Sequence, residues 1–491
     1  MAIICVDAGT TVIKAVGYDS SGAEAAVARR ATVVSRPAPG HAEQDMGAVW
    51  DAVAATVREV AAQVGGADLV AVTAQGDGCW LVDAAGEPTG PAILWNDARA
   101  ASYVDAWTRD GLAETAFRRN GSAAASGLPH AILTWLHAND PGRLARSHAN
   151  LTCGGWIYSR LTGELVADES DASAPFMDLR TRAYAPDLLS LFGLEWAERL
   201  LPPVRACPVA ELSRDAAAAL GLAAGTPVVM APYDIASTAL GSGAVSAGQA
   251  CGILGTTLCT EVVVDAPDLD GAPTGITIAL PGGYLRAFPT FAGTEVVQWT
   301  CGLLGLDGPA DLGELALLSE PGAGGLAFLP YLSPAGERAP FSDPLARGSL
   351  LGMSFEHGRE HVARAVLEGL TMVIRDCLAA TGADPTELRV CGGGSASATW
   401  LALIADVTGL PVRRSADTEV GARGAGLVGL AATGAAPSIA EAAGQHVRLR
   451  EAVEPDPSRR ARYDQLYEDF LTLRANNAGA WPLLGAMRGR T

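Results

Sequence analysis

The first segment able to do chemistry is Asp7-Ala-Gly-Thr-Thr11, which is followed by the only lysine of the chain, Lys14. Gly9, Thr10 and Thr11 offer backbone N–H groups and hydroxyls that suit phosphate oxygens. Asp7 ends an apolar run and could hold a hydrated Mg²⁺, while Lys14 could neutralise a phosphate. An ordinary hairpin turn explains the same residues, so both interpretations stay open for this segment alone.

A second segment, Cys251-Gly-Ile-Leu-Gly-Thr-Thr257, repeats this plan about 245 residues later. Both segments have the pattern of a strand, a Gly-Thr-Thr turn and a second strand, with the later turn at Gly255, Thr256 and Thr257. The same tripeptide in the same setting, half a chain apart, indicates a duplicated pair of domains.

A glycine run, Gly392-Gly-Gly394, lies between a predicted strand (388–391) and a predicted helix (395–408). Glycines at this position let a flat ligand approach the backbone, and the helix N-terminus that follows favours anions. A tight strand-to-helix turn is the alternative explanation.

Asp234 follows the apolar strand Val228–Ala231 and opens a small-residue helix that ends near Gly243. A carboxylate at this position is usually an N-cap. It is also where α/β sheets place their ligands, so Asp234 is a candidate general base.

Two polar loops follow short apolar runs, Gln75-Gly-Asp77-Gly-Cys-Trp80 and Trp95-Asn-Asp97-Ala-Arg99. Amide, carboxylate, indole and guanidinium groups near strand ends offer a polyhydroxy ligand both hydrogen bonds and an apolar face. Ordinary surface loops would have the same composition.

His357-Gly-Arg-Glu-His361 fits a zinc-protease pattern, H-x-x-E-H. Gly358 stands where a helix is only beginning, and no third ligand is evident. The start of a surface helix explains these residues better than a zinc site does.

The elements around these motifs alternate between strands and helices, which predicts an α/β fold. Valines at helical spacing predict a helix over 47–64 capped by Asp45, and further helices are predicted over 359–381, 417–433 and 457–474. We place one domain boundary near residue 245, between domains 1–245 and 246–491.

The 491 residues carry 35 basic and 54 acidic side chains, a net charge of −19. This field repels nucleic acids and anionic membranes, so we expect neither as a partner. No apolar run reaches the roughly 20 residues of a membrane span, and the first residues do not resemble a signal peptide. Nine scattered cysteines without a C-x-x-C pair indicate a cytoplasmic protein. The sequence is compatible with a homodimer but does not determine the oligomeric state.

Taken together, the motifs resemble the FGGY family of carbohydrate kinases, of the superfamily that includes actin, Hsp70 and sugar kinases. The resemblance extends from Asp7 to about residue 433. It also rests on shorter matches, namely Tyr233-Asp234, Pro330-Tyr-Leu-Ser-Pro-Ala-Gly-Glu-Arg-Ala-Pro340, Arg347-Gly348, Arg364-Ala-Val-Leu-Glu-Gly369 and Ala405-Asp-Val-Thr-Gly-Leu-Pro-Val412. It implies two ribonuclease-H-like domains with an interdomain cleft, the first binding mainly the sugar and the second mainly ATP.

The resemblance also implies residue roles, with Asp234 as the catalytic base and Asp7 and Asp234 near the metal, Mg²⁺. ATP would be bound by Asp7, Gly9, Thr10, Thr11, Lys14, Gly255, Thr256, Thr257, Gly293, Gly393, Gly394 and Ser397. The acceptor would contact Gln75, Asp77, Trp80, Trp95, Asp97 and Arg99. The spacing from Gly293 to Gln298 is one residue longer than usual, so the roles of these two residues stay open.

The implied reaction transfers the γ-phosphoryl group of MgATP to a hydroxyl of a small sugar or polyol. Gln75-Gly-Asp-Gly78 followed by Trp80 resembles the erythritol and threitol kinase branch, so a tetritol is the first choice of acceptor. The alternatives are xylulose, L-xylulose, ribulose and glycerol. A non-catalytic ATP-binding module is a more distant alternative, since it should lack both Asp234 and the polar loops.

Overall fold

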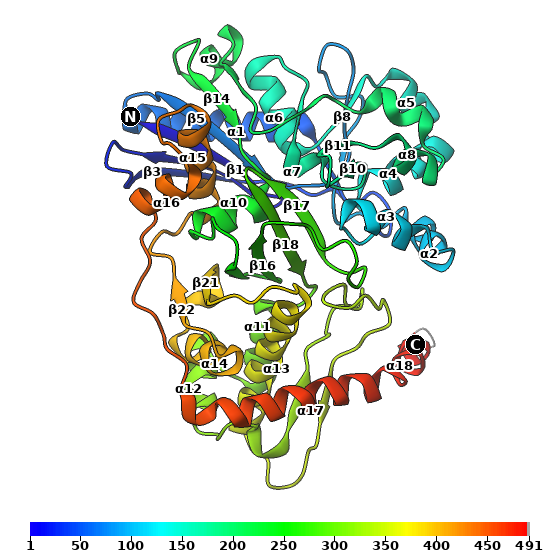
Figure 1. The fold of residues 1–491 in the computed structure, drawn as a ribbon, viewed down its shortest axis with the longest axis vertical. Helices are drawn as coiled ribbons and strands as arrows, with labels where there is room; N and C mark the ends of the chain where they lie inside the picture. Colours follow the sequence, from blue (N-terminus) through cyan, green and yellow to red (C-terminus); the bar gives the residue numbers. More distant parts are fainter. Residues whose placement is uncertain (489–491) are drawn as a thin grey trace. The chain divides into compact units, whose positions relative to one another are not determined.

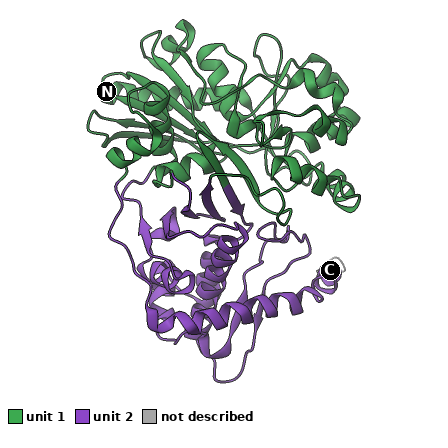
Figure 2. Cartoon of the chain, viewed as in Figure 1, with its two compact units in different colours: residues 1–245, 265–285, 419–447 green, residues 246–264, 286–418, 448–491 purple. Residues whose placement is uncertain are grey.

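A computed structural model describes residues 1–488, which form two compact units (Figures 1 and 2). Unit 1 comprises 1–245, 265–285 and 419–447, and unit 2 comprises 246–264, 286–418 and the described residues from 448 onward. The predicted boundary near residue 245 coincides with a change of unit, but two later segments return to unit 1, so the units are not continuous halves of the chain. Residues 489–491 of the predicted second domain lie outside the described residues.

Unit 1 is built on a sheet with the strand order β13-β14-β5-β1-β2-β3. The strands of the unit are β1 (Ile3–Ala8), β2 (Val12–Tyr18), β3 (Glu24–Ala31), β4 (Glu43–Gln44), β5 (Leu69–Ala74), β6 (Trp80–Val82), β7 (Ala92–Ile93), β8 (Ala149–Leu151), β9 (Ala167–Asp168), β10 (Met177–Asp178), β11 (Ala183–Tyr184), β12 (Val204–Arg205), β13 (Val209–Glu211), β14 (Pro227–Met230) and β17 (Ile276–Leu280). Its helices are α1 (Met46–Val64), α2 (Ala101–Arg109), α3 (Leu112–Asn120), α4 (Pro129–Asn139), α5 (Pro141–Arg146), α6 (Cys153–Thr162), α7 (Glu169–Ala172), α8 (Pro186–Leu191), the 3₁₀ helix η1 (Glu195–Leu200), α9 (Arg214–Leu220), α10 (Asp234–Gly241), α15 (Val420–Ala432) and α16 (Ile439–His446).

Side-chain alternation along β1 decides which helices cover the two faces of this sheet. Ile4 and Val6 belong to the hydrophobic core shared with α1 and α6. Cys5 points to the opposite face, where a Cβ on Gly426 of α15 would lie 3.1 Å from its sulfur. The predicted cap of α1 is confirmed, because the Asp45 carboxylate accepts a hydrogen bond from Ala48 N. The sheet is therefore covered on both faces.

Unit 2 repeats the central strand pairings of unit 1. Its sheet contains strands in the order β18-β16-β15-β21-β22. The strand β15 pairs antiparallel with β16 and parallel with β21, as β1 pairs with β2 and β5. The strands are β15 (Gln249–Leu254), β16 (Leu258–Val264), β18 (Gly283–Pro289, in unit 2 from Arg286), β19 (Ala327–Leu329), β20 (Ser349–Leu351), β21 (Glu387–Cys391) and β22 (Val412–Arg414). The helices are α11 (Thr294–Leu304), α12 (Pro309–Ala316), η2 (Ala323–Gly325), α13 (Arg359–Ala380), η3 (Gly393–Ala396), α14 (Ala398–Thr408), η4 (Pro457–Arg459), α17 (Arg460–Ala478) and α18 (Trp481–Arg488).

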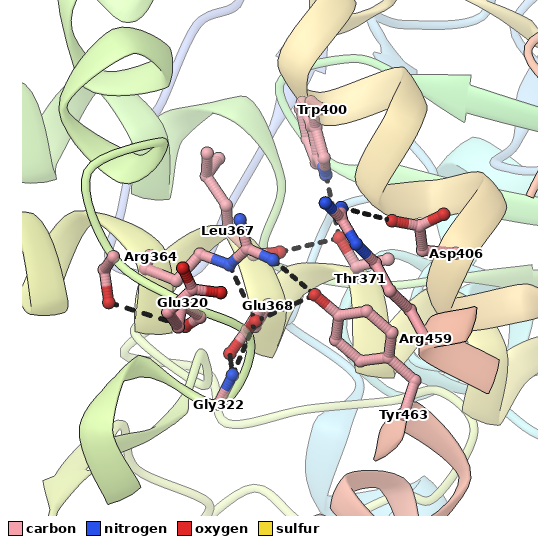
Figure 3. Close-up of polar contacts among 11 residues, drawn as sticks. Glu320, Gly322, Arg364, Leu367, Glu368, Thr371, Trp400, Asp406, Arg459 and Tyr463 are labelled. Atoms are coloured by element: carbon pink, nitrogen blue, oxygen red, sulfur yellow. Dashed lines mark hydrogen bonds and ion pairs between the residues drawn. The ribbon is translucent and has the colours of Figure 1, made fainter. Parts of the chain in front are cut away.

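Buried polar contacts join α13 to its neighbours in unit 2 (Figure 3). The Glu368 carboxylate accepts hydrogen bonds from Arg364 Nε (2.7 Å), Gly322 N (3.0 Å) and the hydroxyl of Tyr463 on α17 (3.1 Å). Because the groups are buried, these bonds fix the C-terminal helix against α13. The predicted helix over 457–474 thus forms part of the packing of unit 2.

Candidate active site

The hairpin of β1 and β2 carries a charged cluster beside its turn. Asp7 stands directly opposite Lys14 in the strand register, so their side chains lie on one face. Lys14 Nζ lies 3.6 Å from Asp7 Oδ2 and 2.9 Å from Glu419 Oε2. Glu419, just before α15, also pairs with Arg29. A single lysine is thus held between two carboxylates.

The pKa values in this cluster reflect burial and the neighbouring charges. Burial raises the pKa of Asp7, and the Glu419 charge adds to this while Lys14 opposes it. Burial lowers the pKa of Lys14, but Asp7 and Glu419 outweigh that effect, so the net shift is upward. Lys14 therefore stays protonated and presents a fixed positive charge.

Asp234 is the first residue of α10, and Tyr233 occupies the N-cap position before it. Its Oδ1 atom accepts a hydrogen bond from Ile235 N (2.8 Å). Burial and the charges of Asp7 and Asp77 raise the pKa of Asp234 to about 7, against the opposing effects of the Ile235 bond and Lys14. A carboxylate with this pKa can take up a proton near neutral pH, as a general base must.

Thr10 connects the hairpin turn to both polar loops. Its hydroxyl donates to Gln75 Oε1 (2.8 Å) and accepts from Trp95 Nε1 (3.0 Å). Gln75 Nε2 donates in turn to Gln44 Oε1 (2.8 Å), and Gln44 Nε2 donates to Thr10 O (2.8 Å). One closed network therefore brings together three residues predicted for two different ligands.

Asp97 and Arg99 form a buried pair rather than an open binding surface. The Asp97 carboxylate accepts from Arg99 Nε (2.9 Å), Arg99 N (2.9 Å) and Ala42 N (2.6 Å). Arg99 also contacts Glu43 Oε1 at 2.6 Å. Asp97 is fully buried, and 4% of the Arg99 side chain is exposed. These bonds hold the loop in place.

Trp80 does not lie in an accessible loop, although the sequence predicted it to contact the acceptor there. Its indole is fully buried in the core of unit 1 and stacks on Trp156 with ring centroids 5.7 Å apart. The cause is the alternation of side chains along β6, since Trp80 and Val82 face this core while Leu81 belongs to a second hydrophobic cluster. The structure therefore speaks against a contact between Trp80 and the acceptor, and we correct that prediction.

The Gln75–Gly78 turn has a conformation that depends on its glycines. A Cβ on Gly76 would lie 2.5 Å from the Tyr233 ring, so Tyr233 can pack there only against glycine. Asp77 has a φ of 56°, in the left-handed region that aspartate tolerates better than most residues. Asp77 is partly exposed, which leaves it accessible to a ligand.

In unit 2 the second Gly-Thr-Thr turn packs against the start of α11. Thr294 N donates to Gly255 O (2.9 Å), and a Cβ on Gly293 would lie 2.6 Å from the carbonyl carbon of Thr257. Gly293 is the residue before α11, so only a glycine lets this helix begin so close to the turn. Thr256 at the tip is exposed.

The glycine run is partly open and partly packed. Gly393 is exposed, and no atom lies within 4 Å of where its Cβ would be. A Cβ on Gly394 would lie 2.6 Å from the Trp400 indole. Ser397 caps α14, since its hydroxyl accepts from Trp400 N (3.2 Å). The helix predicted over 395–408 is therefore a 3₁₀ turn, η3, followed by α14.

The two histidines of the zinc-like pattern have local partners. Gly358 N donates to His361 Nδ1 (2.9 Å), and Ser354 N donates to His357 Nδ1 (2.9 Å). The first bond caps the start of α13, and the second lies in the turn just before that helix. Within residues 1–488 no group of three or more His, Cys, Asp or Glu side chains is arranged to hold a metal ion.

Three residues near the predicted ones were not found from the sequence. Glu419 pairs with Lys14, Gln44 completes the Thr10 network, and Asp171 of α7 accepts a hydrogen bond from Thr152 Oγ1 (2.8 Å). None lies in a motif with a recognised spacing. Their only sequence signal is a polar residue beside a short apolar run, which is common.

Two α/β units with matching strand plans, two Gly-Thr-Thr hairpins and a carboxylate suited to proton transfer fit an enzyme that transfers phosphoryl groups. The FGGY family of carbohydrate kinases, N-terminal domain, matches residues 2–241, and the C-terminal domain of that family matches residues 250–433. The chain belongs to the FGGY family of carbohydrate kinases. The predicted family, the two-domain α/β fold and the carbohydrate kinase activity are thereby confirmed.

The similar proteins are named for several acceptors. The chain is 34% identical to an erythritol kinase of Brucella abortus, over 99% of this chain and 98% of that relative. It is 30% identical to an L-xylulose/3-keto-L-gulonate kinase of Escherichia coli, over 95% of each chain. A xylulose kinase structure from Rhodospirillum rubrum has 28% identity and a TM-score of 0.90, covering 98% of this chain and 100% of that one. No helix in the described part of the chain is long and apolar enough to cross a membrane.

Proposed function

We propose that this carbohydrate kinase phosphorylates a tetritol, such as erythritol or threitol, with ATP as the phosphoryl donor. The transfer step rests on Asp234, a buried carboxyl group at the start of α10 whose pKa of about 7 lets it accept the proton of an attacking hydroxyl. The similarity to the erythritol kinase of Brucella abortus supports the choice of acceptor. Kinases of this family use ATP.

In the proposed mechanism, residues of unit 1 bind the acceptor and move its proton. Asp77 accepts hydrogen bonds from vicinal hydroxyls, and Trp95 offers its ring to the same ligand. Gln75, whose two amide atoms bond to Thr10 and Gln44, acts as a positioning residue. Asp234 orients the attacking hydroxyl and takes its proton. Asp97 and Arg99 act as positioning residues, because their polar atoms are already used within the protein.

The phosphate groups are assigned to the two hairpin turns. Lys14 supplies a fixed positive charge, and the backbone N–H groups at Gly9–Thr11 and Gly255–Thr257 supply neutral donors, together with the hydroxyls of Thr11, Thr256 and Thr257. The open backbone at Gly393 leaves room for the nucleoside. Positioning and charge neutralisation supply most of the catalysis in such a transfer.

Mg²⁺ fits the acidic groups of unit 1. Asp7 and Asp234 offer carboxylate oxygens, the ligands this ion prefers, and burial raises the pKa of both groups, an effect that a bound cation would offset. When bound, Mg²⁺ would neutralise charge that develops on the phosphates.

A coupled assay of ADP release over polyols and ketoses of three to six carbons, with and without Mg²⁺, tests this proposal. We expect the highest kcat/KM for a tetritol and no turnover without Mg²⁺. Good turnover of a pentulose such as L-xylulose, with none of erythritol or threitol, would overturn the choice of acceptor while leaving the kinase class intact.

A cytoplasmic location and a homodimer remain predictions. All nine cysteines of the chain are free thiols in the structure, which supports a reducing compartment.

A further inference from the structure

Unit 1 contains a small cavity beside α7 that the proposed mechanism does not use. Its volume is about 30 Å³, and its walls include Asn150, Thr152, Asp171, Phe176 and Tyr184. A space of this size holds one or two groups as large as a water molecule or a hydroxyl. The cavity is therefore too small for a whole sugar but large enough for one end of it.

Two polar side chains in this cavity have uncommitted atoms. Asp171 Oδ2 accepts from Thr152 Oγ1 (2.8 Å), but Asp171 Oδ1 has no partner among the described residues. Asn150 Oδ1 also lacks a partner there, although only 7% of Asn150 is exposed. Buried oxygens of this kind are costly unless a donor reaches them, so the cavity requires a polar occupant.

The geometry of the pair suits an alcohol. A carboxylate oxygen accepts a hydrogen bond from a hydroxyl, and a side-chain amide can turn over to offer either its oxygen or its NH₂ group. One hydroxyl could thus donate to Asp171 Oδ1 and accept from the amide of Asn150. A water molecule could instead donate to both oxygens.

The cavity lies next to the segment that leads from β14 to Asp234. Ser170, the neighbour of Asp171 in α7, accepts a hydrogen bond from Tyr233 N (3.2 Å), and Tyr233 directly precedes Asp234. Burial raises the pKa of Asp171, and among the further causes are the charges of Asp77 and Asp234. These charges act on Asp171 because the three carboxylates belong to one region of unit 1.

We propose that this cavity is a subsite for one terminal hydroxyl of the acceptor, bound between Asp171 Oδ1 and the side-chain amide of Asn150. The inference rests on the proposed function and deepens it, because a subsite of this size selects acceptors by length and by the presence of that hydroxyl. Asp171 and Asn150 are then specificity-determining residues for a short polyol.

The test compares erythritol with erythro-1,2,3-butanetriol, in which a methyl group replaces one terminal hydroxymethyl group. In the wild type, we expect the triol to have a kcat/KM lower by about 10- to 100-fold, because the buried carboxyl group of Asp171 would be left without its hydrogen-bond partner. In Asp171→Asn, erythritol should lose a similar factor and the triol less than about threefold, so the preference between them collapses. The KM for ATP should stay within about twofold.

Asn150→Leu provides a second variant, and it should also reduce the preference for erythritol. Asp105→Asn, an exposed residue of α2, is the matched control and should leave both acceptors unaffected. Melting temperatures of all variants show that they are folded. Equal losses for both acceptors in the folded variants would overturn the subsite and show that the cavity holds only water.

The wild-type assay separates this result from a failure of the proposed acceptor. If another polyol or ketose is the better substrate, the tetritol assignment fails, and the same ratio is measured with that substrate and its terminal deoxy form. An unchanged ratio in the variants would then overturn the subsite by itself.

Discussion

The two Gly-Thr-Thr hairpins are both antiparallel strand pairs but have very different surroundings. In unit 1 the hairpin carries Asp7 and Lys14, with Glu419 as a further partner of the lysine. In unit 2 the corresponding positions, counted from the turn, are Ile253 and Thr260, although the register there is shifted by one residue and pairs Ile253 with Cys259. The duplicated backbone thus provides a phosphate-sized turn twice, whereas the charged groups are concentrated in one copy. We infer that unit 1 performs the proton and charge chemistry and that unit 2 mainly binds.

The largest effect is expected when the proposed base, Asp234, is removed from unit 1. Asp234→Asn keeps the shape of the side chain but cannot accept a proton at neutral pH, so kcat should fall about 10²- to 10⁴-fold. ATP binding, measured by calorimetry, should persist. Near-normal turnover in this variant would remove the base from the mechanism and, with it, the functional contrast between the units.

The next prediction compares substitutions at positions of the two hairpins that correspond when counted from the turn. Lys14→Met removes a cation from between two carboxylates, and we expect kcat/KM for ATP to fall about 10- to 100-fold. Thr260→Val, at the corresponding position of unit 2, should change it by less than about threefold. Equal losses in the two variants would show that the charge difference between the hairpins has no functional meaning.

The pH dependence of the reaction tests the role of Asp234 in unit 1 without a mutation. The base is active when deprotonated, and burial raises the pKa of Asp234 to about 7. The kcat/KM for the acceptor should therefore be constant above this pH and fall about tenfold for each pH unit below it. A profile that stays flat down to pH 5 would contradict the raised pKa.

The smallest effect is expected for a substitution in unit 2, which we infer mainly binds. Trp400, which packs beneath Gly394, donates its indole N–H to Thr371 Oγ1 of α13 (3.0 Å), as shown in Figure 3. Thr371→Val removes this acceptor, so we expect the KM for ATP to rise about threefold with kcat unchanged. Thr371→Ser keeps the hydroxyl and should behave like the wild type. A change in kcat would show that unit 2 does more than bind.

Local sequence signals predicted the elements well. The valine spacing and Asp45 predicted α1, and the apolar runs around the Gly-Thr-Thr turns predicted both hairpins. These elements depend on side chains that are close in sequence, so periodicity and capping rules are sufficient to find them.

The parts of the site that depend on tertiary packing could not be predicted. Glu419 reaches Lys14 from a distant segment, and no local pattern encodes such a pair. Trp80 was expected in a binding loop, but it lies in β6 with its indole buried in the core of unit 1. Asp171 lies in a four-residue helix without a motif. In each case the outcome depends on which strands and helices become neighbours, and single-sequence analysis does not determine this.

The late segment 419–447 has a consequence for how the protein is made. It brings Glu419 and α15 to unit 1, and α15 packs so closely on α10 that a Cβ on Gly424 would lie 1.8 Å from Ser237 O. During synthesis on a ribosome, the first unit therefore stays incomplete until residue 447 has emerged. A nascent chain paused after residue 245 would leave a face of α10 bare, and we expect it to depend on chaperones until the missing helix arrives.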